Sequence, residues 1–131
     1  MKLTVLHIDD DPDVRLLVRE LARPAPQIQV LDAPGVEEAI ARYSGLEPDT
    51  ILLDNRLGAS SGLELLPRIR QIWSCPVWIL SGFSRDLLHE RAAQCGAAGV
   101  ISKDELLEDA AHFQVILHRA ATVRERTQVS S

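Results

Sequence analysis

The sequence has few of the residues that stabilise small secreted proteins or bind zinc. Its only cysteines are Cys75 and Cys95, and neither lies in a Cys-x-x-Cys or Cys/His ligand spacing. We therefore expect no zinc site and no disulfide framework. Both cysteines are interpreted as packing or helix-end residues of a protein in a reducing compartment.

Long hydrophobic runs are also absent. No stretch approaches the roughly 20 apolar residues of a membrane span. The apolar run in MKLTVLHIDD ends at Ile8, which is too short for the core of a secretory signal. The sequence therefore predicts a cytoplasmic protein that does not associate with membranes.

Basic runs are missing as well, and the formal net charge is -5. This charge argues against nucleic-acid binding through a phosphate-tracking patch and favours a protein or small-molecule partner. With 131 residues, of which 46% are hydrophobic and 25% charged, the composition is that of one ordinary domain. Such a chain buries roughly two-thirds of its unfolded surface, so one core can stabilise it.

Short apolar segments alternate with segments of helical periodicity along the whole chain. Because each connection is long enough for a helix and none is a two-residue hairpin, the pattern predicts an α/β protein with a doubly wound parallel sheet. The predicted strands are residues 3–8, 28–31, 50–54, 76–81 and 98–102. The predicted helices begin at Pro12 and after Ser61, and span 36–43, 84–96 and about 104–119.

Two helix starts carry capping signals. Asp11 precedes Pro12, so its carboxylate can accept from free amides while proline occupies the first helical position. Ser61 and Glu64 have capping-box spacing. Pro67 lies too late for the first turn of that helix, so the helix either kinks there or begins later.

Polar side chains follow three of the predicted strands. Asp9 and Asp10 end the first strand, Asp54 ends the third, and Ser81 ends the fourth. In doubly wound sheets the carboxyl ends of the strands form the binding site. Three carboxylates at one point repel one another unless a cation lies among them, and oxygen ligands with spare positions suit Mg²⁺. The sequence therefore predicts a magnesium site.

Lys103 follows the fifth strand and brings a positive charge to the same edge, where Ser81 adds a small hydroxyl. A metal, a lysine and a hydroxyl around one carboxylate would stabilise a transferred phosphoryl group. Asp54 is then the nucleophile. Each residue alone has an ordinary reading, as a turn, a strand end or a surface charge, so their joint placement carries the prediction.

The pattern HIDDDPDVR at 7–15, Asp54 followed by Gly62, Ser81-Gly82 and Lys103 resembles the receiver domain of two-component response regulators. The resemblance covers residues 3 to about 119. It implies a flavodoxin-like α/β fold, with a doubly wound five-stranded parallel sheet in strand order 2-1-3-4-5 and five helices. We expect a receiver domain at 1–121 and a polar tail at 122–131.

The resemblance also assigns roles to residues. Asp54 matches the phosphoacceptor, which takes a phosphoryl group from a histidine kinase or histidine phosphotransfer protein. Asp10 would bind Mg²⁺ directly and Asp9 through water, and the backbone carbonyl of Arg56 would complete the metal shell.

Ser81 and Lys103 would contact the phosphoryl oxygens. Asp11 falls outside the acidic pair and is expected to cap the helix. Arg56 and Phe83 would flank the site.

Three positions depart from the family pattern. Gly58 replaces a proline and predicts a looser loop, and Asp104 replaces the proline after the lysine, so the cis peptide of the family is not expected. Val100 stands where an aromatic side chain often acts as a rotamer switch. The sequence therefore predicts intact phosphorylation chemistry with an altered readout.

The leading hypothesis is a phosphoacceptor switch that is not an enzyme and signals to a downstream protein effector. The alternative is a phosphorylation-independent adaptor. A flavodoxin-like or hydrolase domain is disfavoured because the first turn, DDDPD, is acidic and glycine-free and would repel a cofactor phosphate. No metal-binding or phosphohistidine role is predicted for the histidines, His7, His89, His112 and His118, and packing roles are predicted for Trp73, Trp78 and Phe113.

Overall fold

The computed structural model describes residues 2–82 and 86–130; Phe83 and the predicted start of the helix at 84–96 lie outside these ranges. Its strands are β1 (Leu3–Ile8), β2 (Ile28–Ala33), β3 (Thr50–Asp54), β4 (Arg56–Leu57), β5 (Ser60–Ser61), β6 (Val77–Ser81) and β7 (Gly99–Ser102). Its helices are α1 (Pro12–Ala22), α2 (Val36–Tyr43), α3 (Gly62–Arg70), α4 (Asp86–Gln94), α5 (Lys103–Leu106) and α6 (Ala110–Ser130).

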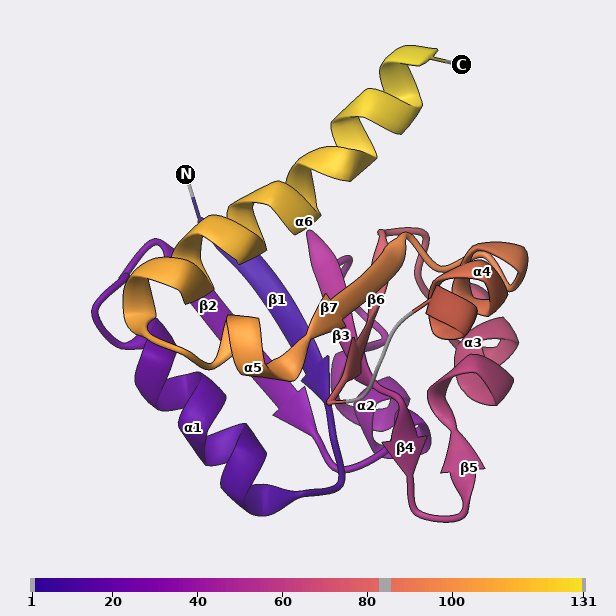
Figure 1. Cartoon of the computed structure of the whole chain (residues 1–131), viewed down its shortest axis with the longest axis horizontal. Coiled ribbons are helices and arrows are strands. Elements are labelled where there is room, and N and C mark those ends of the chain that lie inside the picture. The colour runs from indigo at the N-terminus through magenta and orange to yellow at the C-terminus, as the bar shows by residue number, and fades with distance from the viewer. Residues whose placement is uncertain (1, 83–85, 131) are drawn as a thin grey trace.

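The main sheet has five parallel strands in the order β2-β1-β3-β6-β7 (Figure 1). Counted along the chain without the short β4 and β5, this is the predicted order 2-1-3-4-5, and the predicted doubly wound fold is confirmed. Because every strand of the sheet runs in the same direction, β1, β3, β6 and β7 end at one edge. That edge carries the acidic residues.

Helices cover both faces of the sheet, as Figure 1 shows. Side chains alternate between the faces along each strand, so each face has its own hydrophobic core. On one face, strand residues such as Leu53 and Ile79 pack with residues of α2, α3 and α4. On the other, strand residues such as Leu52 and Leu80 pack with residues of α1, α5 and α6. The strands are thereby buried on both sides, which explains their nearly continuous apolar sequences.

The C-terminal helical segment differs from its prediction. The single helix expected at about 104–119 is interrupted, so the described chain has six helices, and α6 continues to Ser130. Asp109 accounts for the interruption, because its carboxylate accepts the amide hydrogen of His112 at 2.8 Å and caps the first turn of α6. The periodicity of the apolar residues continues through this break and does not show it.

A small hairpin replaces the turn expected after β3. The strands β4 and β5 pair antiparallel, with Arg56 opposite Ser61 and Leu57 opposite Ser60. Strands of two residues leave no periodicity in a sequence, so this hairpin was missed. The next helix begins directly after its cap Ser61, whose side chain accepts the Glu64 amide, so a later start of this helix is wrong.

Asp11 caps α1 as predicted, since its carboxylate accepts the amide hydrogen of Asp13 at 2.9 Å and Pro12 opens the helix. All peptide bonds across the described ranges are trans, including the one before Asp104. Ser102 caps the short α5 at this point. None of the helices in the part of the chain that is described has the length and apolarity needed to cross a membrane.

We expect Gly99→Ala to destabilise the fold. A Cβ atom at position 99 would lie 2.6 Å from Cζ3 of Trp78, and the indole is held in place by a hydrogen bond to the Ala120 carbonyl. The free energy of unfolding should fall by about 1–3 kcal/mol, measured by urea denaturation. Gly45→Ala is the control, because a Cβ there meets nothing within 4 Å. Equal stability of the two variants would contradict this packing.

Candidate functional site

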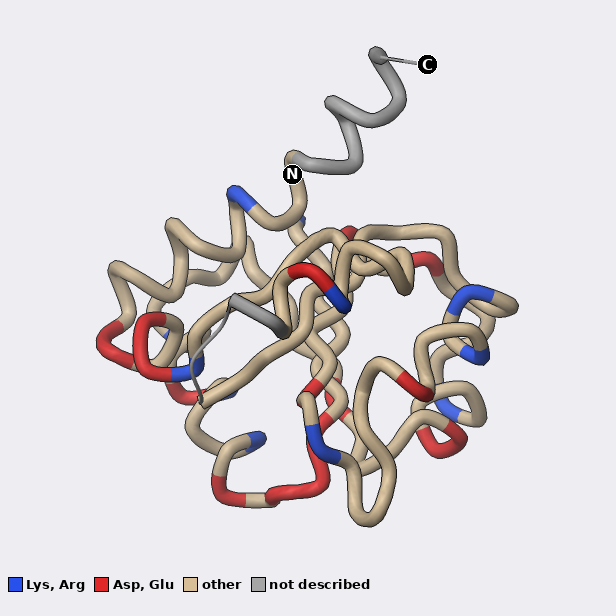
Figure 2. Tube along the Cα trace, turned by 45° about the vertical axis from the view of Figure 1, so that its right-hand side comes forward, with Lys and Arg blue, Asp and Glu red and all other residues tan. Residues whose placement is uncertain are grey.

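A cleft of about 320 Å³ opens at the carboxyl edge of the sheet. Acidic residues follow one another through the loop from β1 into α1 beside it, as Figure 2 shows. The cleft is lined by residues from four strand ends and from the β4–β5 hairpin, among them Asp9, Asp10, Asp54, Arg56, Gly58, Ser81 and Lys103. The structure therefore brings together all the site residues that the sequence predicted within the described ranges.

The three carboxylates form one cluster. Oxygen atoms of Asp9, Asp10 and Asp54 lie within 4.8 Å of one another. Asp9 and Asp54 are buried, whereas Asp10 is exposed. They converge because β1 and β3 are neighbours in the sheet and end together.

Lys103 forms an ion pair with Asp54, with 2.7 Å between Nζ and Oδ1. Burial is the main influence on the Asp54 carboxyl and raises its pKa, and the charges of Asp9 and Asp10 add to this effect. The hydrogen bond and charge of Lys103 act in the opposite direction but do not compensate, so the pKa lies above the ordinary 3.8. Ionisation of Asp54 is therefore less favourable than that of an ordinary aspartate carboxyl.

Both oxygens of the Asp9 carboxylate and its backbone carbonyl contact neighbouring residues. Its Oδ1 accepts the amide hydrogen of Asp11 at 2.9 Å, and its backbone carbonyl accepts from Nη1 of Arg15 at 2.7 Å. Its Oδ2 lies 3.4 Å from Nε2 of His7. Burial raises the pKa of Asp9, but the His7 side chain, the Asp11 amide and Lys103 outweigh burial, and the pKa lies below 3.8.

The Asp10 side chain is hydrogen-bonded to the β4–β5 hairpin. The amide of Gly58, at the tip between β4 and β5, donates to Oδ2 of Asp10 at 2.8 Å. Gly58 has a φ of 61°, which proline cannot adopt, and proline has no N–H to donate. The glycine thus joins the hairpin to the acidic cluster, a contact that proline could not make.

Ser81 and Arg56 both line the cleft. Ser81 is buried at the end of β6 and lies opposite Ser102 of β7 in the sheet register. Arg56 is exposed and begins β4, two residues after Asp54. Both residues line the cleft, as their positions in the sequence predicted.

Sequence reasoning missed the connections made by His7, Arg15 and Gly58. The strand period of two could have indicated the first, since His7 lies two residues before Asp9 and so on the same face of the sheet. Nothing in the sequence indicates the second and third. A backbone amide and a carbonyl become partners of distant side chains only when the chain is folded.

The donor set fits a hard divalent cation. Carboxylate oxygens are the ligands that Mg²⁺ and Ca²⁺ prefer, and clustered carboxylates repel one another when no cation is present. Oδ2 of Asp9 is also buried without a hydrogen-bond partner among the residues described. Such an atom is stabilised by a nearby positive charge or donor.

Comparison with known proteins identifies the family. The model of the response regulator receiver domain matches residues 5–112. The chain belongs to this family. It is thus a receiver domain of the two-component type, and the resemblance seen in the sequence is confirmed.

The relatives combine such a domain with further sequence. The nitrate/nitrite response regulator protein NarL of Escherichia coli (strain K12) is 35% identical over 122 residues, which cover 90% of this chain and 54% of NarL. The transcriptional regulatory protein YdfI of Bacillus subtilis (strain 168) is 31% identical over 109 residues, covering 82% of this chain and 51% of YdfI. The receiver domain therefore spans about half the length of these curated relatives.

Solved structures share the fold. NtrX from Brucella abortus has a TM-score of 0.79 and 26% identity, over 99% of this chain and 29% of that chain. The chemotaxis protein CheY4 of Vibrio cholerae has a TM-score of 0.77 and 21% identity, over 92% of this chain and 99% of that chain. At 21% identity, the similarity to CheY4 shows a shared fold and nothing more.

We expect Asp54→Asn to stabilise the receiver domain in the absence of divalent cations. Because burial raises the pKa of Asp54 in the folded state, ionisation of this carboxyl costs stability at neutral pH. Asparagine removes this cost, so the free energy of unfolding should rise by about 0.5–2 kcal/mol at pH 7. The gain should shrink as the pH falls toward 3.8 and disappear below it, where the wild-type carboxyl becomes protonated in both states.

Urea denaturation at pH 7 and pH 4 with a chelator measures this effect. Glu90→Gln, an exposed substitution on α4, is the matched control and should change stability little. A less stable Asp54→Asn at pH 7 would show that the ion pair with Lys103 dominates over burial.

Proposed function

We propose that this receiver domain is a Mg²⁺-dependent phosphoacceptor that takes a phosphoryl group onto Asp54. The observation that carries the proposal is the Asp54 carboxylate, which lies in a cleft with two further carboxylates and 2.7 Å from Nζ of Lys103. Phosphoryl transfer needs a nucleophile, a divalent cation and positively charged or hydrogen-bonding side chains around the phosphoryl oxygens. The domain acts as a substrate of its donor and not as an enzyme with a substrate of its own.

In the proposed transfer, an oxygen of the Asp54 carboxylate attacks the phosphorus of a phosphohistidine. The new P–O bond forms as the P–N bond breaks, and the imidazole of the donor leaves with the electron pair and takes up a proton. Lys103 then releases the carboxylate and pairs with a phosphoryl oxygen. Ser81, which lines the same cleft, donates its hydroxyl hydrogen to another phosphoryl oxygen.

The cation would be held by the carboxylates of Asp9, Asp10 and Asp54 and by the backbone carbonyl of Arg56. When bound, it offsets the negative charge of the cluster and of the phosphoryl group. Gly58 keeps the Asp10 carboxylate at the cleft before a cation arrives, through the amide hydrogen bond of 2.8 Å.

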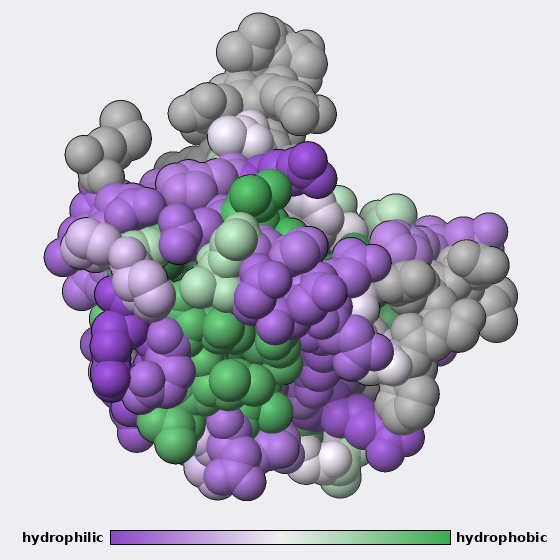
Figure 3. Space-filling model, turned by 60° about the vertical axis from the view of Figure 1, so that its left-hand side comes forward, coloured by the Kyte–Doolittle hydropathy of each residue, from purple (hydrophilic) through white to green (hydrophobic). Residues whose placement is uncertain are grey.

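The donor is proposed to be a histidine kinase or a histidine phosphotransfer protein that contacts α1. Asp11 both lines the cleft and caps α1, so this helix begins at the cleft. Leu16 and Leu17 on α1 are 56% and 42% exposed. A hydrophobic area lies on the side of the molecule that carries α1 (Figure 3). Exposed leucines beside a reactive cleft suit a protein donor.

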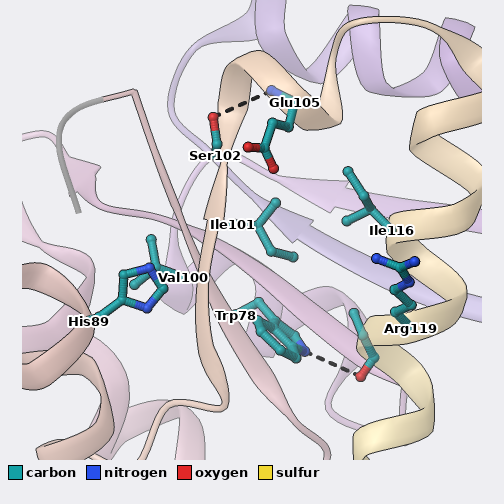
Figure 4. A pocket seen from close by; sticks show the side chains of 9 residues that line it. Trp78, His89, Val100, Ile101, Ser102, Glu105, Ile116 and Arg119 are labelled. Atoms are coloured by element: carbon teal, nitrogen blue, oxygen red, sulfur yellow. Dashed lines mark hydrogen bonds between the residues drawn. The ribbon is translucent and has the colours of Figure 1, made fainter. Parts of the chain in front are cut away.

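The surface that changes on phosphorylation and binds the effector is proposed to be formed by α4, β7 and α6. Trp78 and Ser81 lie on the same strand, β6, and the indole Nε1 donates to the Ala120 carbonyl of α6 at 3.2 Å. Figure 4 shows this bond beside a hollow of about 280 Å³ between the three elements. Val100 packs on the other face of the sheet, and Trp78 supplies an aromatic contact between the sheet and α6. A downstream protein effector would bind this face.

We expect beryllofluoride with Mg²⁺ to change the amide NMR spectrum and the Trp78 fluorescence of the wild type in a saturable way. Beryllofluoride forms an analogue of the acyl phosphate on the aspartate, so Asp54→Ala should show no such change. Trp78→Phe identifies the source of the fluorescence signal. A wild type that does not respond would favour the adaptor alternative, which Val100 in place of an aromatic residue also motivates.

We expect Leu16→Lys to slow transfer from a phosphohistidine protein about 5- to 10-fold, as the loss of a contact worth 1 kcal/mol or more would do. Phosphorylation by acetyl phosphate should not change, because this small donor needs no protein contact. Val115→Lys, at a 51% exposed residue of α6, is the control. Equal slowing with both donors would show that the substitution damages the cleft and not the docking surface.

A further inference from the structure

His7 is a buried imidazole directly beneath the acidic cluster. It lies on β1 with no exposed surface, two residues before Asp9, and strand alternation places both side chains on one face of the sheet. Its neighbours across the sheet are Asp32 of β2 and Leu52 of β3. A leucine or valine would fit an apolar interior at lower cost, so the histidine requires an explanation.

The polar atoms of this imidazole have no hydrogen-bond partner in the described part of the chain. The same is true of Oδ2 of Asp9, and the separation between this oxygen and Nε2 of His7 is 3.4 Å. A buried polar atom left without a partner costs about 1–3 kcal/mol. A shift of a few tenths of an ångström would turn this contact into a hydrogen bond that satisfies one atom on each side.

The carboxylate of Asp32, opposite His7 in the sheet register, already accepts hydrogen bonds from an arginine. Asp32 accepts two hydrogen bonds from Arg19, at 2.5 Å from Nε and 2.7 Å from Nη2, and Nε of Arg15 lies 3.9 Å away. Asp9 therefore remains as the acceptor within reach of Nε2 of His7. Contacts of this kind are often long in an unliganded site and shorten when the ligand binds.

We infer that His7 is a positioning residue, whose Nε2–H group donates to Oδ2 of Asp9 and fixes the orientation of this carboxylate for the cation. The Asp11 amide holds Oδ1 at 2.9 Å, so His7 provides the second point of attachment. A carboxylate oxygen can accept more than one interaction, so this donor leaves Oδ2 able to face a cation or its water. The inference rests on the proposed cation site.

Isothermal titration with Mg²⁺ tests the role of this donor. We expect His7→Leu to weaken binding about 10-fold, as is usual when a residue that orients a metal ligand is removed. His7→Gln should remain within about 3-fold of the wild type, because its amide Nε2 can reach the same position and donate.

The ring nitrogens of His7 give a second, independent measurement. In the wild type without Mg²⁺, ¹⁵N NMR should show a hydrogen on Nε2. A hydrogen on Nδ1 alone would overturn the inference, because the lone pair of Nε2 would then face the carboxylate. Equal Mg²⁺ affinity of wild type and His7→Leu, or equal weakening in the leucine and glutamine variants, would also overturn it.

These outcomes separate the inference from the proposed function. A wild type that binds no Mg²⁺ contradicts the proposed function itself. A wild type that binds Mg²⁺ and is unaffected by His7→Leu contradicts only the role of His7.

Discussion

Mutual repulsion among Asp9, Asp10 and Asp54 is the constraint on which this structure depends. Their oxygen atoms lie within 4.8 Å of one another, and two of the three side chains are buried. A fold gains nothing in stability from such a cluster, so the surrounding residues must hold it together. The parallel sheet supplies the positions, because neighbouring strands deliver their last residues to the same edge.

The surrounding contacts act on each carboxylate in a different way. Lys103 neutralises part of the charge on Asp54, the Gly58 amide restrains Asp10, and the Asp11 amide with His7 restrains Asp9. The pKa of Asp54 is raised even so, chiefly by burial and further by the charges of Asp9 and Asp10. The cluster is thus prepared for a cation and for the transfer of charge that the proposed phosphorylation would bring. At one departure from the family pattern, Gly58 contributes a hydrogen bond that proline cannot make.

The proposed effector-binding face at α4, β7 and α6 depends on apolar and aromatic packing, whereas the site depends on charged side chains. Val100 packs into the core shared with α2, α3 and α4, whereas Trp78 packs on the other face and bonds to α6. Gly99 makes room for the indole, so the aromatic contact of this face comes from β6 and not from β7. A single strand therefore carries both the hydroxyl at the cleft and the ring that touches α6, which gives the proposed signal a short path.

The resemblance to receiver domains implied the strand order. The sequence by itself determined the five parallel strands, the caps Asp11 and Ser61, and the gathering of Asp54, Lys103 and the acidic pair. These features follow from local periodicity and from the rule that parallel strands end together. Only the tertiary structure decided the β4–β5 hairpin, the break before Ala110, and the contacts of His7 and Gly58 with the acidic pair. The hairpin is too short to leave a period, the break depends on one capping carboxylate, and the contacts join atoms whose separation depends on how the whole chain packs.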